Sequence, residues 1–181
     1  GHTTMLLGAA QHLARTRDFS GTVYVIFQPA EEGGNAGARS MINDGLFKIF
    51  KMDSIWAIHN WPGLEVGQTV VHTGAVMAGA DIFILTIDGK GGHAALPHQS
   101  NDPVVAAGMV IVALQTLTSR RLDPFDQTVI SLTRLDAGSA YNVIPAVASV
   151  SGTLRTMKST TRELMLVEIE RVALQAAATL G

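Results

Sequence analysis

The sequence predicts an α/β fold in two parts, and two patterns along the chain carry this prediction. In the first part, short β-branched or aromatic runs alternate with helical stretches, an order that favours parallel strands. In the second part the order is strand, helix, strand, strand, helix, which is the split β-α-β-β-α-β unit of ferredoxin-like folds without its last strand. We expect a partial α/β domain with parallel-type strands over residues 1–76 and a ferredoxin-like domain over residues 77–181.

The first part opens with a helix in which apolar residues recur at helical spacing from Leu6 to Leu13. The β-branched and aromatic residues that follow end at Pro29, as expected of a buried strand. Gly45 then stops a short helix, and small residues lead into the second part. The expected elements are a helix over residues 4–16, a strand over 22–27, a helix over 36–44, and strands over 54–58 and 67–72.

The second part has two helices with recognisable starts. Asp102 is suited to cap the first helix, with Pro103 at its first position, and Thr160 with Glu163 forms a capping box for the second. The apolar faces are expected to consist of Val104, Ala107, Gly108, Ile111 and Leu114 in the first helix, and of Met165, Ile169, Val172, Ala173 and Ala176 in the second. The expected elements are strands over residues 81–88, 128–135 and 146–156 and helices over 102–119 and 160–180.

Composition excludes several classes of protein. The 181 residues are 47% hydrophobic and 15% charged, which indicates a globular chain with a buried core. A net charge of -2 without clusters of lysine or arginine argues against a nucleic-acid partner. No apolar run approaches the roughly 20 residues that cross a bilayer, so no membrane span is expected. Because there are no cysteines, disulfides and thiolate metal sites are excluded, and we expect a cytoplasmic protein.

Candidate metal-binding groups follow two strands of the first part. Glu31 and Glu32 come after the strand at 22–27, and His59 ends the strand at 54–58. The carboxyl ends of neighbouring parallel strands meet at one edge of a sheet, where α/β folds place their sites. One carboxylate could then bind a metal while the other holds the proton of a metal-bound water. The alternative is two solvated carboxylates in a turn and a histidine of the core or of a strand end.

Three further candidates lie in the second part. His93 follows a flexible glycine-rich segment and could polarise a carbonyl group or stabilise an oxyanion. Arg155 stands on the polar face of the strand at 146–156, where it suits a substrate carboxylate, and Asn142 could donate a second hydrogen bond. The alternatives are a glycine-rich turn with an incidental histidine, an exposed arginine, and an asparagine that forms a turn.

Taken together, these segments resemble the dinuclear-metal aminoacylases and carboxypeptidases, in the branch of hippurate hydrolase and the plant hydrolases of indole-acetyl amino acids. The start of the chain, Gly1-His2-Thr3-Thr4, resembles the tail of that branch's Cys-Gly-His-Asp-Gly-His-Thr signature. The other matching motifs, in family order, are Gln28-Pro29-Ala30-Glu31-Glu32-Gly33, Ala57-Ile58-His59-Asn60, Gly89-Lys90-Gly91-Gly92-His93-Ala94-Ala95-Leu96-Pro97-His98, Asn142-Val143-Ile144-Pro145 and Gly152-Thr153-Leu154-Arg155-Thr156.

The resemblance implies a metal-dependent hydrolase that cleaves the amide bond of N-acyl amino acids or small peptides. In this interpretation Glu31 is the general base, and Glu32 and His59 are ligands of a pair of divalent ions, zinc or manganese. Residues 1–76 would be part of the catalytic domain. Residues 77–181 would be the lid domain, which carries the contact of a homodimer.

The resemblance also implies roles for the candidates in the lid. His93 would stabilise the tetrahedral oxyanion, in this family often at the active site of the neighbouring subunit. Asn142 and Arg155 would hold the carboxylate of the amino-acid part of the substrate. These three assignments follow from the matching motifs.

Several metal ligands of the family have no counterpart in the chain. The signature's cysteine and first histidine would lie before Gly1, a late histidine would lie after Gly181, and His2 aligns with a histidine that is not a ligand. Two protein ligands are fewer than the roughly three that each catalytic zinc ion needs. We therefore expect this polypeptide alone to be inactive and metal-poor. The alternative function is a non-catalytic dimerising or amino-acid-binding module built on the second part.

Overall fold

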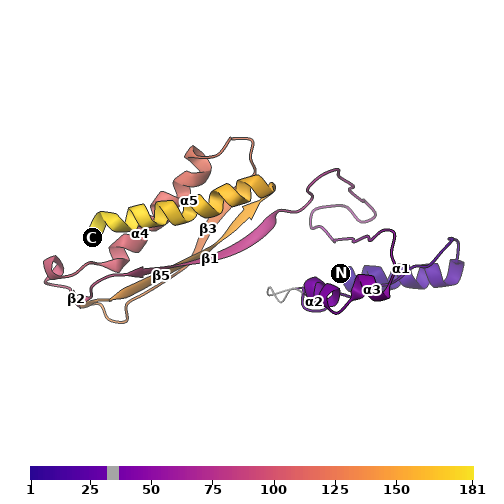
Figure 1. Ribbon diagram of the computed structural model, residues 1–181, viewed down its shortest axis with the longest axis horizontal. Helices are drawn as coiled ribbons and strands as arrows, with labels where there is room; N and C mark the ends of the chain where they lie inside the picture. The colour runs from indigo at the N-terminus through magenta and orange to yellow at the C-terminus, as the bar shows by residue number, and fades with distance from the viewer. Residues whose placement is uncertain (32–36) are drawn as a thin grey trace. The chain divides into compact units, whose positions relative to one another are not determined.

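The computed structural model describes residues 1–31 and 37–181, which divide into two compact units, Gly1–Thr69 and Val70–Gly181. The sequence-based boundary was placed between residues 76 and 77. Figure 1 draws the first unit in indigo to purple and the second from magenta to yellow.

The described residues of the first unit form three helices: α1 (His2–Thr16), α2 (Gly37–Asn43) and α3 (Leu46–Ile49). α1 ends where Arg17 takes a left-handed conformation with φ 50°, and its N–H donates to the carbonyl of Leu13. Helices were expected in both the α1 and the α2 region, whereas α3 was not. Among the described residues of this unit, only Gly37 and Gly45 are buried. The unit therefore has no buried apolar side chain within its described residues.

The strands expected over residues 22–27, 54–58 and 67–72 are wrong, because these segments carry no regular secondary structure. Their apolar side chains are exposed, with Tyr24 at 41% and Trp56 at 90%. A strand is stable only when a neighbouring strand pairs with its N–H and C=O groups, and β-propensity depends on that context. No such neighbour is present in the part of the first unit that the structure describes.

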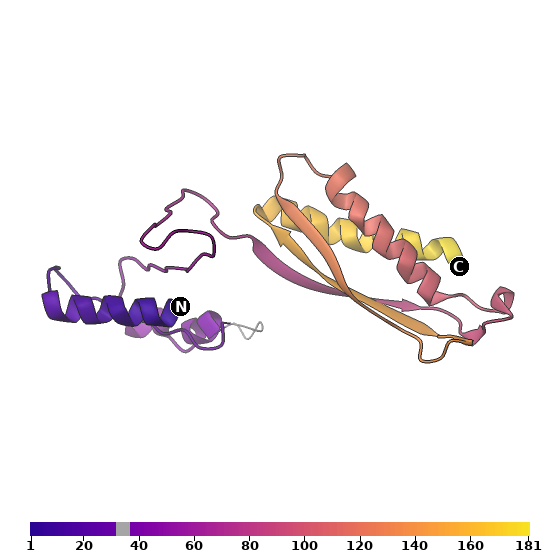
Figure 2. The same ribbon diagram turned by 180° about the vertical axis from the view of Figure 1, so that it is seen from behind.

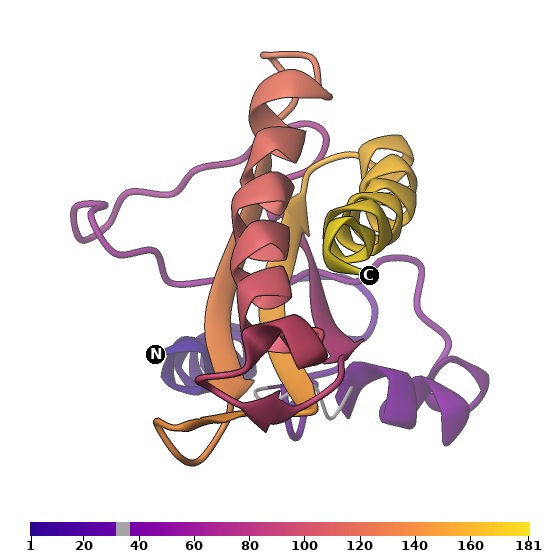
Figure 3. The same ribbon diagram turned by 90° about the vertical axis from the view of Figure 1, so that its left-hand side faces the viewer.

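The second unit contains a three-stranded antiparallel sheet covered on one face by two helices (Figure 2). Its strands are β1 (Gly79–Asp88), β3 (Thr128–Ala137) and β5 (Val147–Thr156), in the spatial order β1-β5-β3. The helices are α4 (Pro103–Arg120) and α5 (Ser159–Ala177), and Figure 3 shows them side by side. A short second sheet pairs β2 (Gly92–His93) with β4 (Val143–Ile144), and the 3-10 turns are η2 (Pro97–Gln99) and η3 (Ala178–Leu180). The α/β class and the β-α-β-β-α order of this unit are confirmed.

The core of the second unit lies between β5 and the two helices. Along β5 burial alternates, so that Val150 and Leu154 are fully buried, whereas Arg155 lies on the opposite, open face of the sheet. α5 contributes Met165, Ile169 and Ala173 to this core, as the sequence predicted. The alternation along β5 also agrees with the prediction.

The buried face of α4 differs from the predicted one. Ala107 and Leu114 are buried as expected, but Val104 is 39% exposed and Gly108 is also exposed. The buried residues of the helix are Pro103, Ala106, Ala107, Val110, Leu114 and Leu117. The prediction failed because α4 is apolar on most of its circumference, so its sequence does not reveal which side meets the sheet.

α4 is also the one helix in the described residues that is long and apolar enough to cross a membrane, by length and composition only. A third of it is buried inside the unit, and Leu114 and Leu117 have no exposure at all. Because its buried side packs in the core of the unit, its length and composition are weak evidence for a span. It nevertheless corrects the expectation that every apolar stretch would be too short.

The starts of the two helices are stabilised differently. At α4 the Asp102 carboxylate accepts the N–H of Val104 at 2.8 Å, as predicted. At α5 the capping box of Thr160 and Glu163 does not form, because Lys158 occupies the N-cap position and makes no side-chain cap. Two ion pairs, Lys158 with Asp126 and Arg162 with Asp81, lie at this end of the helix instead.

One carboxylate is buried between the helices. Glu168 on α5 is 6% exposed and accepts hydrogen bonds from Arg171 at 2.7 Å and from Arg121 at 2.9 Å. These bonds, the one from Arg171 first, lower the pKa of Glu168 from 4.5 to about 2. Glu168 is therefore ionised at neutral pH and ties the end of α4 to α5.

Candidate functional site

The imidazole of His59 is held in one tautomer by the backbone carbonyl of the next residue. Its Nδ1 lies 2.7 Å from the carbonyl oxygen of Asn60, and a carbonyl can only accept a hydrogen bond. Nδ1 therefore carries the proton, and the lone pair is on Nε2. A backbone carbonyl that orients a histidine in this way is the usual support of a metal-binding imidazole. The local geometry of His59 thus suits the predicted role of metal ligand.

Two aromatic rings pack against His59. The ring of His2, at the start of α1, meets it edge to face with centroids 4.1 Å apart, and the ring of Trp61 lies at 6.0 Å. The beginning of the chain and the segment around His59 are therefore neighbours within the first unit. The sequence aligned His2 with a signature histidine that is not a ligand, and gave no signal for this ring contact.

The predicted carboxylates are not brought to His59 by the described structure. Glu31 is exposed, and within residues 1–31 and 37–181 it makes no hydrogen bond or ion pair. Glu32 lies outside the described residues. Among the residues that are described, no group of three His, Asp or Glu side chains could hold a metal ion. The meeting of Glu31, Glu32 and His59 at one site stays a prediction.

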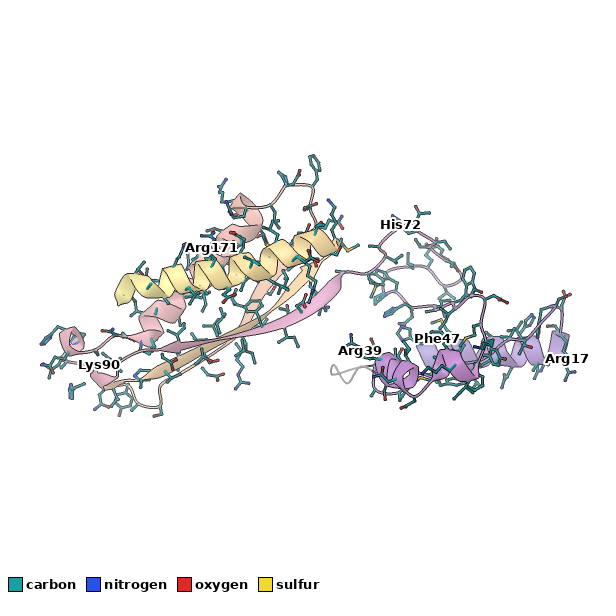
Figure 4. The ribbon with its side chains drawn as sticks, viewed as in Figure 1. Arg17, Arg39, Phe47, His72, Lys90 and Arg171 are labelled. Atoms are coloured by element: carbon teal, nitrogen blue, oxygen red, sulfur yellow. The ribbon has the colours of Figure 1, made fainter. Side chains whose placement is uncertain are left out.

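His93 lies on a tightly packed turn at one end of the second unit, in a segment of residues 89–96 that we call the histidine loop. Lys90, labelled in Figure 4, exchanges two backbone hydrogen bonds with Asn101, at 2.9 and 3.0 Å. A Cβ atom at Gly91 would lie only 2.8 Å from the carbonyl oxygen of Ile144. The glycine there permits close contact between two backbones, so the loop is fixed rather than merely flexible.

The structure brings His93 and Asn142 together. In the small sheet His93 pairs with Val143, and the N–H of Ala94 donates to the carbonyl oxygen of Asn142 at 3.1 Å. The side chains of His93 and Asn142 are both exposed at this end of the unit. Two of the predicted substrate-contacting residues therefore lie close together along the backbone, at the same end of the unit.

A shallow hollow adjoins this surface. Its volume is about 380 Å³, and it lies between the start of α4 and the loop from β3 to β4. Val143, which pairs with His93, lines it together with the exposed ring of Tyr141. Most of the lining residues are small, and the hollow presents polar and apolar surface in similar amounts.

Arg155 lies near the other end of the same sheet. In register it is flanked by Ala80 on β1 and Val129 on β3, and it is exposed on the open face. The ion pairs found among the described residues do not include it, so its guanidinium is accessible to a ligand. With a rise of ~3.3 Å per residue along β5, Arg155 lies on the order of 25 Å from Val147 at the start of the strand. Within one copy of the chain, Arg155 therefore lies far from His93 and Asn142.

The family model described as Peptidase family M20/M25/M40 matches residues 1–178. The chain belongs to this family. The resemblance found in the sequence is thereby confirmed, and with it the relation to aminoacylases and carboxypeptidases.

Named relatives are similar over most of the chain. Hippurate hydrolase of Campylobacter jejuni is 40% identical over 172 residues, which are 95% of this chain and 44% of that protein. IAA-amino acid hydrolase ILR1-like 2 of Arabidopsis thaliana is 43% identical over 178 residues, which are 98% of this chain and 40% of that protein. This M20 family chain spans less than half the length of these curated relatives.

A solved structure in the same family is similar in fold. The Bacillus subtilis YXEP protein, a dinuclear metal binding peptidase from the M20 family, matches with a TM-score of 0.76 and 37% identity. The match covers 99% of this chain and 44% of that one. The likeness supports the α/β class assigned from the sequence.

Sequence reasoning missed one polar contact at the histidine loop. The backbone N–H of Ala95 donates to Nδ1 of His93 at 3.1 Å. No sequence signal could have revealed it, because any residue except proline supplies the same N–H.

Proposed function

We propose that this chain forms part of a metal-dependent amidohydrolase that cleaves the amide bond of N-acyl amino acids or small peptides. The observation that carries the proposal is the family match over residues 1–178, together with the exposed His93 and Asn142 at one end of the second unit. Two relatives are named hippurate hydrolase and IAA-amino acid hydrolase, after conjugates of this kind, and these names support this substrate class. A cytoplasmic setting stays a prediction.

The metal centre in this proposal holds two divalent ions, zinc or manganese, with Glu32 and His59 among the ligands. His59 fits, because its Nε2 lone pair is free to coordinate. Bound ions would supply an activated water at neutral pH. Among the candidate ligands, His59 is the one that the structure describes, whereas a catalytic zinc site needs roughly three protein ligands per ion. The remaining ligands are therefore not assigned to the described residues.

The chain's own residues would act on the substrate as follows. Glu31 accepts a proton from the attacking water and passes it to the leaving nitrogen. Arg155 binds the substrate carboxylate through its planar guanidinium, and Asn142 adds a hydrogen bond. His93 donates a hydrogen bond to the carbonyl oxygen as negative charge develops there.

A homodimer is part of the proposal, since Arg155 and His93 of one copy lie too far apart to contact one small substrate. His93 and Asn142 of one copy would complete the site that Arg155 of the other copy occupies. α4 offers a surface for such a contact, because a second apolar stripe runs along its outer side. The stripe consists of Val105, Gly108, Met109 and Val112, exposed by 51% at Val105 and 70% at Val112. β3 is an edge strand beside α4 and could pair with its own copy.

The oligomeric state can be tested by light scattering coupled to size exclusion. Val112→Asp places a charge in the outer stripe of α4 and is expected to convert a dimer to a monomer. Leu174→Asp is the matched control, because Leu174 is 65% exposed on α5, outside the stripe. A monomeric parent protein, or equal effects of the two substitutions, would contradict the dimer through α4.

The catalytic proposal is tested on the full gene product, including any sequence that flanks these residues, with hippurate and related N-acyl amino acids and added manganese or zinc. Glu31→Gln is expected to lower kcat by roughly 10²-fold or more. Arg155→Gln is expected to raise KM for substrates with a free carboxylate and to leave esters of those substrates unaffected. No turnover of any N-acyl amino acid with either metal would overturn the proposal. Binding of an amino acid without turnover would favour the alternative, a non-catalytic dimerising or amino-acid-binding module.

A further inference from the structure

The turn that follows β2 directs three successive backbone N–H groups to defined acceptors. Ala94 donates to the carbonyl of Asn142 at 3.1 Å, and Leu96 donates to the carbonyl of His93 at 2.8 Å. Between them, Ala95 donates to Nδ1 of the His93 ring at 3.1 Å. The imidazole is therefore held by a backbone N–H of its own turn, that of the residue two positions further along the chain.

This contact decides which nitrogen of His93 carries the proton. A backbone N–H can only donate, so Nδ1 must be the unprotonated nitrogen of the neutral ring. The proton is then on Nε2, on the far side of the ring from Ala95. We infer that Ala95 is a positioning residue whose N–H holds His93 as an Nε2–H donor. The inference rests on the proposed function in one respect only: the acceptor of this donor is taken to be a substrate carbonyl oxygen.

The contact fixes the direction of the ring as well as its tautomer. Turning the ring by half a revolution would present carbon-bound hydrogen to the Ala95 N–H and leave that donor without a partner. The turn itself is anchored, because Ala94 is tied to Asn142 and the close contact at Gly91 leaves little space for the loop to move. A donor that is already aimed before substrate arrives needs no reorganisation during the reaction.

His59 provides the opposite case within the same chain. Its Nδ1 faces a carbonyl oxygen, that of Asn60, and must be protonated, which leaves Nε2 as a lone pair. His93 faces an amide hydrogen, which leaves Nε2 protonated. Local backbone polarity thus suits one imidazole to coordinate a cation and the other to donate to an anion.

The tautomer can be read directly by nitrogen NMR of the 181-residue chain labelled with ¹⁵N-histidine, at about pH 8, above the ordinary histidine pKa. His93→Gln identifies the His93 signals. The expected result is an unprotonated Nδ1 and a protonated Nε2 for His93. His72 is the internal control, because it is exposed and no hydrogen bond to its ring is found among the described residues. It is expected to show a mixture of tautomers.

Ala95→Pro removes the N–H and is expected to give His93 the mixed pattern of His72, whereas Ala95→Gly keeps the N–H and the parent pattern. If Ala95→Pro disturbs the turn, the Ala95 amide of the parent chain serves instead. Its proton resonance should shift as His93 is titrated, because protonating Nδ1 breaks the bond. The inference would be overturned if His93 showed a mixture of tautomers in the parent chain. It would also be overturned if the Ala95 amide resonance did not shift during the titration. These readouts need no turnover, so they stand apart from any failure of the amidohydrolase proposal.

Discussion

The two units of the chain are stabilised in different ways. Val70–Gly181 has a core in which Leu114, Val150 and Leu154 have no exposed surface. Gly1–Thr69 has helices of similar regularity, but its described apolar side chains stay at least partly exposed. Helices without a buried face gain little beyond their intrinsic propensity, which is marginal in water.

The candidate site residues are thus divided between a unit with a buried core and a unit without one. His59 and Glu31 belong to the unit without a core, whereas His93 and Arg155 are mounted on a sheet that buries its own apolar residues. Groups on the second unit are therefore preorganised by this chain alone. Groups on the first unit depend on additional contacts for the same precision.

The largest expected effect comes from a substitution in the core of the second unit. Leu154→Ala is expected to destabilise the second unit by about 2–5 kcal/mol, because it leaves a cavity at a fully buried position. The far-UV circular dichroism transition in urea should move to lower urea. Tryptophan fluorescence should not follow, because both tryptophans, Trp56 and Trp61, lie in the first unit and are exposed.

Ile84→Ala is the matched control for Leu154→Ala, since Ile84 is 69% exposed on the open face of the same sheet. It should change the transition by much less. If fluorescence and circular dichroism shifted together in Leu154→Ala, the two units would unfold as one, and the comparison between them would fail.

A close backbone contact in the central strand gives the next largest effect. A Cβ atom at Gly152 would lie 2.2 Å from the carbonyl oxygen of Ser131 on β3. Gly152→Ala is therefore expected to cost about 1–3 kcal/mol, as overpacking usually does. The urea midpoint of the circular dichroism transition measures it, and an unchanged midpoint would mean that β3 and β5 can move apart freely.

Glu168 links the helices in a way that depends on pH. The arginines lower its folded pKa from 4.5 to about 2, so its stabilising contribution is fully present above about pH 4.5 and is lost as pH falls toward 2. The urea midpoint of the second unit should fall over this range. In Glu168→Gln that fall should be smaller, and the loss at pH 7 should be less than in Leu154→Ala, because both arginines keep access to water. The same pH dependence in both proteins would contradict this role.

The smallest expected change is a gain. A Cβ atom at Gly108 meets nothing within 4 Å, so Gly108→Ala should stabilise α4 by about 0.5–1 kcal/mol through helix propensity. Measured beside Gly152→Ala, it separates a glycine required by this chain's packing from one that is not. A loss of stability or of dimerisation instead would show that the outer stripe of α4 contacts something at this point.

Local signals in the sequence predicted local structure well. Asp102 caps α4 through its neighbours' N–H groups, and the alternation along β5 follows from one buried and one open face. Strands at 22–27 and 54–58 failed, because a strand depends on a partner that the segment itself does not encode. α4 was misread for a related reason, since the sheet and not the helix sequence selects the buried side.

The candidate site was predicted in its residues but not in its arrangement. Motif order led to His93, Asn142 and Arg155, yet the neighbourhood of His93 and Asn142 arises from the pairing of β2 with β4 across the fold. The distance of Arg155 from both follows from the length of β5, a strand that the sequence predicted over residues 146–156. The Ala95 contact is invisible in sequence, because it is made by backbone.

The length of β5 has a consequence of its own. The number of residues between Val147 and Arg155 sets the distance between the two ends of the strand, which carry the proposed ligand-contacting residues or adjoin them. Side chains alternate between faces, so this distance can change only in steps of two residues, about 7 Å, if Arg155 is to keep its face. Each such step would have to occur in β1 and β3 as well, to keep the ladders paired. The spacing of the two ends is therefore difficult to alter gradually, and variation among relatives should concentrate in the loops that the strands carry.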